Sequence, residues 1–459
     1  MKSIIKLSLA AMTLFVSLAA GAQNTRSGYF VDDYTYRFQL NPAFGNSRGF
    51  VAMPALGNLN VGVNGNLHLD HVLYNINGKT TTFMNPGVNT ASFLNGISDV
   101  SRLRVNAKID ILSFGFKAFG GYNTFNINAR TEVGANIPKS FFSLLKEGLT
   151  NKTYSIEDLA VRGRGYAEIA LGHSHDINKE WRIGATLKVL VGGADVDAKL
   201  RNSNLTLGVD KWTITSDAEI NASLKGLTYD TDLNDRTNHR YVSGADVEDA
   251  GIGGYGAAVD LGVIYKPAAL KDWTFSLALL DLGFIKWNNN MLASTNGIKT
   301  FNTDEFTFNV DDSPTTPNSF KKEWDIIQDK LSALYELDDM GDQGGRTTAL
   351  AATLNVGAEY TFPLYRKLSF GLLNTTRING AYSWTDFRLS ANIAPVKAFD
   401  ASVNLAAGTY GVGFGWLANL HVPGFNLFFG MDHTVSKLAK QFVPLSSNAS
   451  FNFGLNFPF

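Results

Sequence analysis

The C-terminal segment of the chain alternates between apolar residues and polar or small residues. Its apolar positions are Ala449, Phe451, Phe453, Leu455, Phe457 and Phe459. Serine, asparagine, glycine and proline occupy the positions between them. A period of two places all the apolar side chains on one face of a β-strand, and no helix has this period. The pattern therefore predicts a strand with one apolar face and one polar face.

The same alternation recurs along the chain in segments of roughly 10 residues, the length that spans a membrane as a tilted strand. The further candidates are 59–69, 103–118, 125–130, 162–171, 181–189, 212–222, 252–266, 272–284, 347–362, 367–376, 382–392, 398–407, 410–421 and 424–432. In several of them the face opposite the apolar one carries charged side chains. A soluble two-sheet sandwich has a dry core and does not need a charged face on its strands. A barrel in lipid, by contrast, has an apolar exterior and a wet lumen.

The pattern therefore predicts an all-β protein, an antiparallel transmembrane β-barrel. Termini that share the periplasmic side require an even number of strands, so we expect about 14, within the range 14–16. The candidates number 15, which is odd. The strand number is 16 if residues 196–208 form an extra short strand, and 14 if one candidate is not in the wall. Short turns at 266–272, 362–367 and 422–424 suit the periplasmic side.

The N-terminus has the features of a secretory signal peptide. Lys2 and Lys6 precede an apolar stretch over 7–18, and Ala20-Gly21-Ala22 matches a cleavage site. We expect residues 1–22 to be removed after Ala22 and the mature protein to lie in the cell outer membrane. The mature sequence has no other run of roughly 18 apolar residues. It also has no Cys, which excludes disulfides and a lipid-modified cysteine.

Two segments are expected outside the barrel wall. Residues 23–57 precede the first clear strand, and we predict a plug-like segment in the lumen; a periplasmic tail or an irregular first strand is the alternative. Residues 58–459 are then the barrel. Within it, 286–346 is predicted to be a long, partly helical extracellular loop, with a helix near 318–337. Its acidic stretch over 301–342 favours a solvated loop over a divalent-cation site.

The composition and motifs do not indicate an enzyme. A net charge of -1 gives no overall attraction for nucleic acid. Residues 251–256 match a dinucleotide-binding glycine pattern, but period-two alternation follows them where that motif needs a helix. His173 and His175 share a strand face without a third metal ligand. Asp432 and His433 are adjacent and would point to opposite faces of a strand. We predict no catalytic residue, cofactor or metal.

The clearest irregularity lies near residue 111. Apolar residues are odd-numbered from Leu103 to Ile111 and even-numbered from Leu112 to Ala118. Such a change of face requires a bulge or kink, so a wall kink is predicted at Ile111 and Leu112. It is either a bulge at the membrane boundary or a sideways opening to lipid. The lumen-facing candidates are Arg162, Arg164, Glu168, Lys188, Asp217 and Glu219.

Four short stretches resemble an uncharacterised family of Bacteroidota-type outer-membrane barrels. They are Asn41-Pro42-Ala43, residues 112–116, residues 281–287 and the terminal Phe459. That family is similar in architecture to long-chain fatty acid transporter (FadL-type) barrels and to the barrel shuttle proteins of the type IX secretion system. The resemblance implies a barrel of about 14 strands with an N-terminal plug. It transfers no ligand residues, because the binding pocket of the transporters has no counterpart here.

Three functions remain open at this point. The first is passive transport of hydrophobic or amphiphilic small molecules through a plugged lumen with an apolar pocket. The second is a protein-binding scaffold or secretion-associated barrel that binds a partner through 286–346. The third is a general hydrophilic porin. In each case the surrounding partner is outer-membrane lipid.

Overall fold

The computed structural model describes residues 25–67, 69–77, 79–147, 151–208, 211–235, 238–302, 325–326, 329, 334–434 and 448–459. The predicted signal peptide and most of the predicted helix near 318–337 lie outside these residues. The described helices are short: η1 (Arg26–Gly28), η2 (Thr35–Gln39), α2 (Leu69–Val72), α3 (Thr90–Asn95), α4 (Lys139–Glu147) and η4 (Gly380–Tyr382). None of them has the length and apolar character that a membrane-crossing helix needs.

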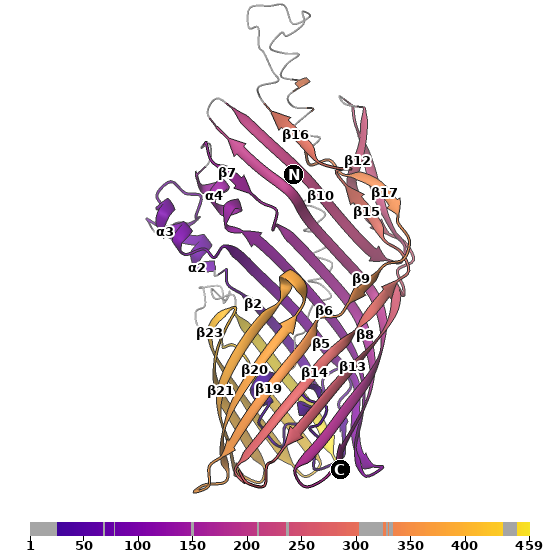
Figure 1. The fold of residues 1–459 in the computed structure, drawn as a ribbon, viewed down its shortest axis with the longest axis vertical. Helices are drawn as coiled ribbons and strands as arrows, with labels where there is room; N and C mark the ends of the chain where they lie inside the picture. Colours follow the sequence, from indigo (N-terminus) through magenta and orange to yellow (C-terminus); the bar gives the residue numbers. More distant parts are fainter. Residues whose placement is uncertain are drawn as a thin grey trace, which may run out of the picture.

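Strands make up the rest of the described architecture, and most belong to one antiparallel sheet (Figure 1). They are β1 (Phe50–Ala52), β2 (Leu59–Gly65), β5 (Val100–Ala118), β6 (Gly121–Pro138), β7 (Thr153–Ser155), β8 (Ala160–Asp176), β9 (Trp181–Leu207), β10 (Trp212–Leu224), β13 (Gly254–Tyr265), β14 (Trp273–Trp287), β15 (Met291–Ser294), β16 (Lys299–Asn302), β17 (Asp338–Asp342), β18 (Thr347–Ala349), β19 (Ala352–Thr361), β20 (Leu368–Ile378), β21 (Trp384–Val396), β22 (Phe399–Gly408), β23 (Gly411–Val422), β24 (Phe425–Met431) and β25 (Ala449–Pro458). Two separate hairpins are β3 (Leu73–Ile76) with β4 (Lys79–Thr82), and β11 (Leu227–Asn234) with β12 (His239–Val247).

The sheet closes on itself, as the alternating pattern predicted. The C-terminal strand β25 pairs with β24 on one side and with β1 and β2 on the other. β1 and β2 also pair with β5, so the first and last strands meet. A closed antiparallel sheet pairs the backbone groups of all its members, which is the condition for crossing lipid with strands.

The number of strands depends on how interrupted strands are counted. Along one edge of β9, for example, β10 pairs with residues 194–207 and β13 pairs with residues 181–192. Counted separately, such strands bring the sheet to 21 among the described residues, and the preferred number of 14 does not describe it. When the interrupted strands are joined, the number of wall positions falls within the predicted 14–16. Residues 196–207 belong to β9 and form no extra strand, which corrects that alternative.

The wall also begins earlier than predicted. β1 pairs at Phe50 with Pro458 of β25 and with Gly115 of β5, before the expected boundary at residue 58. With only 3 residues, β1 is too short to carry a recognisable alternation.

The polarity of the two faces identifies a transmembrane barrel. On β9, Leu187 is 67% exposed whereas its neighbour Lys188 is 8% exposed. The same contrast recurs around the sheet, where exposed positions are leucine, valine, isoleucine and phenylalanine and buried ones are often asparagine, serine, aspartate or arginine. This is the reverse of a water-soluble protein and is typical of a barrel whose exterior contacts lipid.

An aromatic core lies inside the barrel near the end that carries the C-terminus (Figure 1). Residues 25–49, which include η1 and η2, contribute the fully buried Tyr29, Tyr34 and Tyr36. Their rings pack against wall residues such as Phe50 and Phe428, at centroid distances of 5.8 Å for Tyr36 with Phe50 and 4.9 Å for Tyr34 with Phe428. We call residues 25–49 the inner segment.

The wall is much taller on one side (Figure 1). β9 has 27 residues, whereas β24 has 7. On the upper part of β9, Val196 and Ala198 form an apolar face opposite Asp195, and the β11–β12 hairpin covers it with Tyr229 and Val242. The packing of this hairpin could not be predicted from the sequence, because the hairpin has few apolar residues.

His239 and Asn234 bond the tip of this hairpin to residues 336–338. The His239 ring nitrogens lie 3.0 Å from Glu336 Oε2 and 2.6 Å from Asp338 Oδ1. The hydrogen bonds to these carboxylates, first to Glu336, raise the pKa of His239 above its ordinary value.

The inverted polarity can be tested by placing a charge on the outer face. We expect Leu187→Arg to lower the free energy of unfolding in lipid by about 2–4 kcal/mol, because Arg near the bilayer midplane is poorly solvated. Leu233→Arg on β11 is the matched control, since Leu233 is also exposed but lies on the hairpin outside the wall. Denaturant titration of both variants in vesicles measures the difference. Equal effects would contradict a lipid-facing β9.

The hairpin contact should depend on pH. Because the folded-state pKa of His239 is raised, its stabilising contribution is complete below the unfolded pKa of about 6.5 and is lost as pH rises through the folded value. Hydrogen exchange, corrected for intrinsic rates, should show weaker protection of β11, β12 and 336–338 at high pH. His239→Gln should remove this dependence and His175→Gln should keep it. Equal protection of the wild type at both pH values would refute the assignment.

Candidate functional site

A bulge in β14 places an aspartate at the centre of the lumen. Leu280 and Asp281 are consecutive and both buried, and the register between β13 and β14 shifts opposite Asp260. Asp281 has a φ of 58°, in the left-handed region that Asp tolerates better than most residues. An extra residue in one strand redirects the side chains around it. The Asp281 N–H donates to Asp260 Oδ1 at 2.7 Å, which anchors the bulge.

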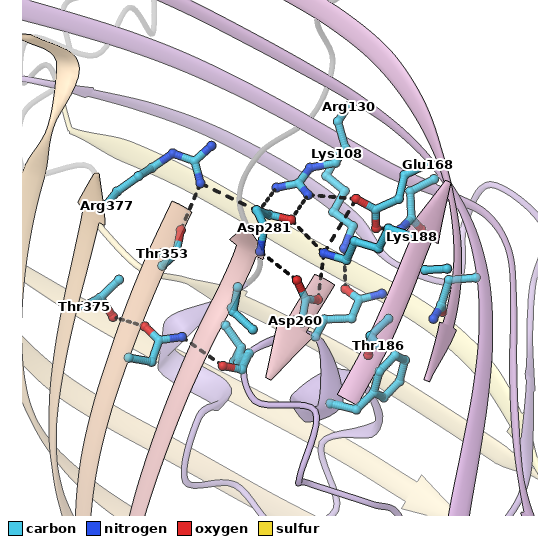
Figure 2. Close-up of a pocket in the computed structure, with 18 of the residues that line it drawn as sticks. Lys108, Arg130, Glu168, Thr186, Lys188, Asp260, Asp281, Thr353, Thr375 and Arg377 are labelled. Carbon is cyan, nitrogen blue, oxygen red and sulfur yellow. Dashed lines mark hydrogen bonds and ion pairs between the residues drawn. The ribbon is translucent and has the colours of Figure 1, made fainter. Parts of the chain in front are cut away.

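Asp281 accepts hydrogen bonds from two cations on other strands (Figure 2). Arg130 of β6 donates through Nη1 and Nη2 at 2.8 and 2.9 Å, a bidentate arrangement. Lys188 of β9 donates from Nζ at 2.6 Å. Charge-assisted pairs of this geometry are among the strongest polar contacts in proteins.

The pairs extend into a network that we call the lumen network. Its members are Lys108, Arg130, Glu168, Lys188, Asp260, Asp281 and Arg377. Lys188 Nζ also lies 2.7 Å from Asp260 Oδ2, and Arg130 Nη1 lies 2.9 Å from Glu168 Oε2. Both signs of charge are present and paired, which offsets the cost of removing them from bulk water.

One contact of the network crosses the lumen. Arg377 of β20 pairs with Glu132 of β6 and lies 4.0 Å from Asp281. In the order of pairing, β20 and β6 are separated by β8, β9, β13, β14 and β19. The ion pair therefore joins distant parts of the wall.

A cavity lies between the lumen network and the inner segment. The space between its lining residues is about 680 Å³, a figure that includes adjoining open solvent. Phe38 and Leu40 of the inner segment line it, with Leu280 and Trp384 of the wall. The lumen network also lines it (Figure 2). The transporter hypothesis predicted an apolar pocket; this cavity is amphiphilic instead, because charged wall residues converge on it.

The inner segment is bonded to the wall on several sides. Arg26 Nη1 lies 2.8 Å from Asp386, and the Arg26 N–H donates to Asp432 at 2.9 Å. The hydroxyls of Tyr29 and Ser276 lie 3.0 Å apart. Burial raises the pKa of Tyr29, so its phenol stays neutral. Through these contacts the inner segment is joined to β14, to β21 and to the residue that follows β24. It forms no strand pairing with any of them.

The six predicted lumen residues fall in three places, all in polar contacts. Glu168 and Lys188 belong to the lumen network. Arg162 and Arg164 surround the buried Asp195, at 3.9 and 2.8 Å, together with Arg346 at 2.8 Å. Asp217 and Glu219 of β10 both contact Arg201 across the β9–β10 pairing.

The sequence reasoning missed Arg130, Asp260, Asp281 and Arg377 as lumen residues. Asp281 had a signal: it is the single charged residue in the apolar run 275–285, at a point where the alternation breaks. Arg130 had the period-two signal, because it lies on the polar face of the predicted strand 125–130. Arg377 had none, because it lies one residue beyond the predicted strand 367–376 and its partners Glu132 and Asp281 come from other strands.

The predicted kink coincides with an irregularity in the wall. The β5–β6 register shifts between Asp110 and Leu112, and Ile111 is exposed. The neighbouring wall position is interrupted there between β1 and β2. Backbone bonds still cross it, because the Ala55 N–H donates to the Ile111 carbonyl at 3.3 Å and the Met53 N–H to the Leu455 carbonyl at 3.0 Å. A sideways opening remains a prediction.

Neither the histidine pair 173/175 nor the glycine pattern 251–256 lines the cavity. The His173 and His175 rings stack at 6.2 Å, and both residues are exposed. Gly254 begins β13, which continues to Tyr265, as the period-two alternation predicted.

Removal of the central charge should destabilise the barrel. Asp281→Asn retains the size and tolerates the left-handed backbone, so it isolates the loss of charge. We expect it to lower the free energy of unfolding by roughly 3 kcal/mol, because Arg130 and Lys188 lose a buried partner. Asp272→Asn, which removes the partner of the exposed Arg366, should cost under about 1 kcal/mol. Denaturant titrations give both values, and equal effects would refute the central role of Asp281.

Three solved structures to which the chain is similar are the following. A mutant of the monoaromatic hydrocarbon channel TodX is 9% identical, with 96% of this chain and 97% of that chain covered and a TM-score of 0.41. A FadL homologue of Pseudomonas aeruginosa is 10% identical, with 96% and 94% covered and a TM-score of 0.39. The translocator domain of the autotransporter NalP from Neisseria meningitidis is 8% identical, with 90% of each chain covered and a TM-score of 0.33.

At these identities and TM-scores the likeness says nothing about a ligand of this chain. No curated protein matches it. A family model, however, matches residues 42–432, from the inner segment to the end of β24. The chain belongs to the family of unknown function DUF5723.

Proposed function

We propose that this barrel lies in the outer membrane and passively passes small amphiphilic molecules through a lumen gated by its N-terminal segment. The observation that carries this proposal is the amphiphilic cavity between the inner segment and the lumen network. In this proposal the part of the predicted segment 23–57 that precedes β1 acts as the plug, and the barrel wall begins with β1. The resemblance to FadL-type barrels implies the same class of function.

The cavity lining favours a molecule that has a hydrocarbon body and an anionic head group. Phe38, Leu40 and Leu280 offer an apolar surface to a hydrocarbon body. Arg130 and Lys188 offer charge-assisted hydrogen bonds to an anionic head group, in competition with Asp281. A wholly apolar ligand would leave these charges without compensation for lost water, so it fits the cavity less well.

Passage requires the inner segment to move. Its contacts with the wall are hydrogen bonds, ion pairs and aromatic packing, none of them covalent. Displacement of part of it would connect the cavity with the end of the barrel where the C-terminus lies. The lumen network would then be the second barrier. The ligand's anionic head group would open it by replacing Asp281 as the partner of Arg130 and Lys188.

The other two functions have less support. A general hydrophilic porin needs a continuous water path, whereas the Arg377–Glu132 pair and the inner segment cross the described lumen. A protein-binding scaffold that uses 286–346 stays a prediction, because much of that loop lies outside the described residues.

Gating can be tested by locking the inner segment to the wall. The chain has no Cys, so Thr35→Cys with Asn426→Cys creates a unique thiol pair; the native Thr35 Oγ1 and Asn426 Nδ2 lie 3.1 Å apart. A reducible bifunctional thiol reagent joins the two. Proteoliposomes then report the flux of fluorescently labelled dodecanoate, with glucose as the hydrophilic comparison.

We expect cross-linking to remove most of the dodecanoate flux and reduction to restore it. Ser402→Cys with Asn392→Cys is the matched control, because it joins β22 to β21 without touching the inner segment. Its flux should not change on cross-linking. Full dodecanoate flux through the locked barrel would overturn the gating proposal, and rapid glucose flux would favour the porin.

A further inference from the structure

A second cluster of ionisable residues lies near the turns at the C-terminal end of the barrel. Asp400 of β22 and Asn419 of β23 are paired directly across the two strands. His421 follows Asn419 by two residues, so it shares the same inward face. Asp33 of the inner segment approaches this face from inside the barrel. Three side chains thus come from rigid wall strands and one from the inner segment.

The ligand atoms of this cluster converge. One oxygen or nitrogen each from Asp33, Asp400 and His421 lie within 4.8 Å of one another. His421 Nε2 contacts Asp400 Oδ1 and lies 3.7 Å from Asp33 Oδ2. The Asp400 and His421 side chains are 5% and 9% exposed, whereas Asp33 is 45% exposed. The cluster is therefore held by a buried wall pair and is reachable from solvent through Asp33.

The side chain of Asn419, which lies beside this cluster, has one polar atom without a hydrogen-bond partner in the described part of the chain. It is fully buried, and its Nδ2 donates to the Asp33 carbonyl at 3.1 Å and to Asp400 Oδ2 at 3.5 Å. Its Oδ1 has no hydrogen-bond partner among the described residues. Several other buried polar side-chain atoms of the described residues also have no hydrogen-bond partner, so this one points to an ion only through its place beside Asp33 and Asp400.

Asp33 and Asp400 share one imidazole, which carries at most one positive charge. Their surroundings also hold cations, because Arg37 is paired with Asp32 and Arg48 lines the same cavity as Asp32 and Asp33. The case for a bound ion therefore rests on the convergence of the donor atoms and not on an excess of negative charge.

From this geometry we propose that Asp33, Asp400 and His421, with Asn419 Oδ1 as a further donor, bind a divalent transition-metal ion of the zinc type that fastens the inner segment to the wall. Imidazole nitrogen with carboxylate oxygens is a donor set that zinc accepts. Tetrahedral zinc with bonds of about 2.0–2.1 Å holds its ligand atoms about 3.3 Å apart. The separation of 3.7 Å between His421 Nε2 and Asp33 Oδ2 therefore needs only a small adjustment, whereas His421 Nε2 and Asp400 Oδ1, which are in direct contact, must move apart to admit the ion. The inference does not depend on what the barrel transports.

The test uses the full-length barrel in detergent, stripped with a chelator and then titrated with Zn²⁺. We expect one tightly bound zinc per barrel, measured by calorimetry and by metal analysis after desalting. His421→Ala and Asp33→Asn should each weaken binding at least about tenfold. His173→Ala is the matched control, because His173 is exposed on the outer face and should leave binding unchanged.

Asp33→Asn keeps the test decisive if His421→Ala fails to fold, since Asp33 is half-exposed and outside the strands. Zinc should also slow hydrogen exchange over residues 25–49 in the wild type and have no such effect in Asp33→Asn. Three results would overturn the proposal: no retained zinc in the wild type, undiminished binding in both site variants, or zinc binding without a change in the exchange of the inner segment. Transport assays are not involved, so failure here is distinct from failure of the gating proposal.

Discussion

Lipid offers no hydrogen-bond partner, and the rest of this structure depends on that constraint. It requires a closed sheet, so β25 must find β1 and β2 after the whole chain has passed around the barrel. It also turns the apolar side chains outward. Many polar side chains of the wall strands are consequently gathered inside, where they are buried. They must satisfy one another.

The lumen network is the result of that crowding. Asp281 meets Arg130 and Lys188 because a bulge adds one residue to β14 and turns an extra side chain inward. A regular strand would place either Leu280 or Asp281 on the outer face. The local irregularity therefore has a global effect, since it supplies the anion around which cations from several strands assemble. The same network forms one wall of the cavity on which the functional proposal rests.

The inner segment solves a related problem at the other end of the cavity. Its aromatic rings fill the space inside the barrel, and its polar atoms meet the polar face of the wall. It makes no strand pairing there, so most of its bonds to the wall involve side chains; the Phe459 N–H, which donates to the Gly49 carbonyl at 2.9 Å, is a backbone contact. An ion bound between Asp33 and the wall would add a connection whose strength depends on metal supply. Control of the inner segment and control of passage are then linked.

The sequence by itself determined the all-β class, the closed barrel and the direction of each strand's two faces, because lipid forces a period of two that is visible in Phe451 to Phe457. It also indicated the irregularity at Ile111 and the charge of the lumen. Only the tertiary structure decided which charges meet. Arg377 and Glu132 are 245 residues apart and come together only when the barrel closes. Such contacts depend on curvature and register around the whole circuit, which no local pattern encodes.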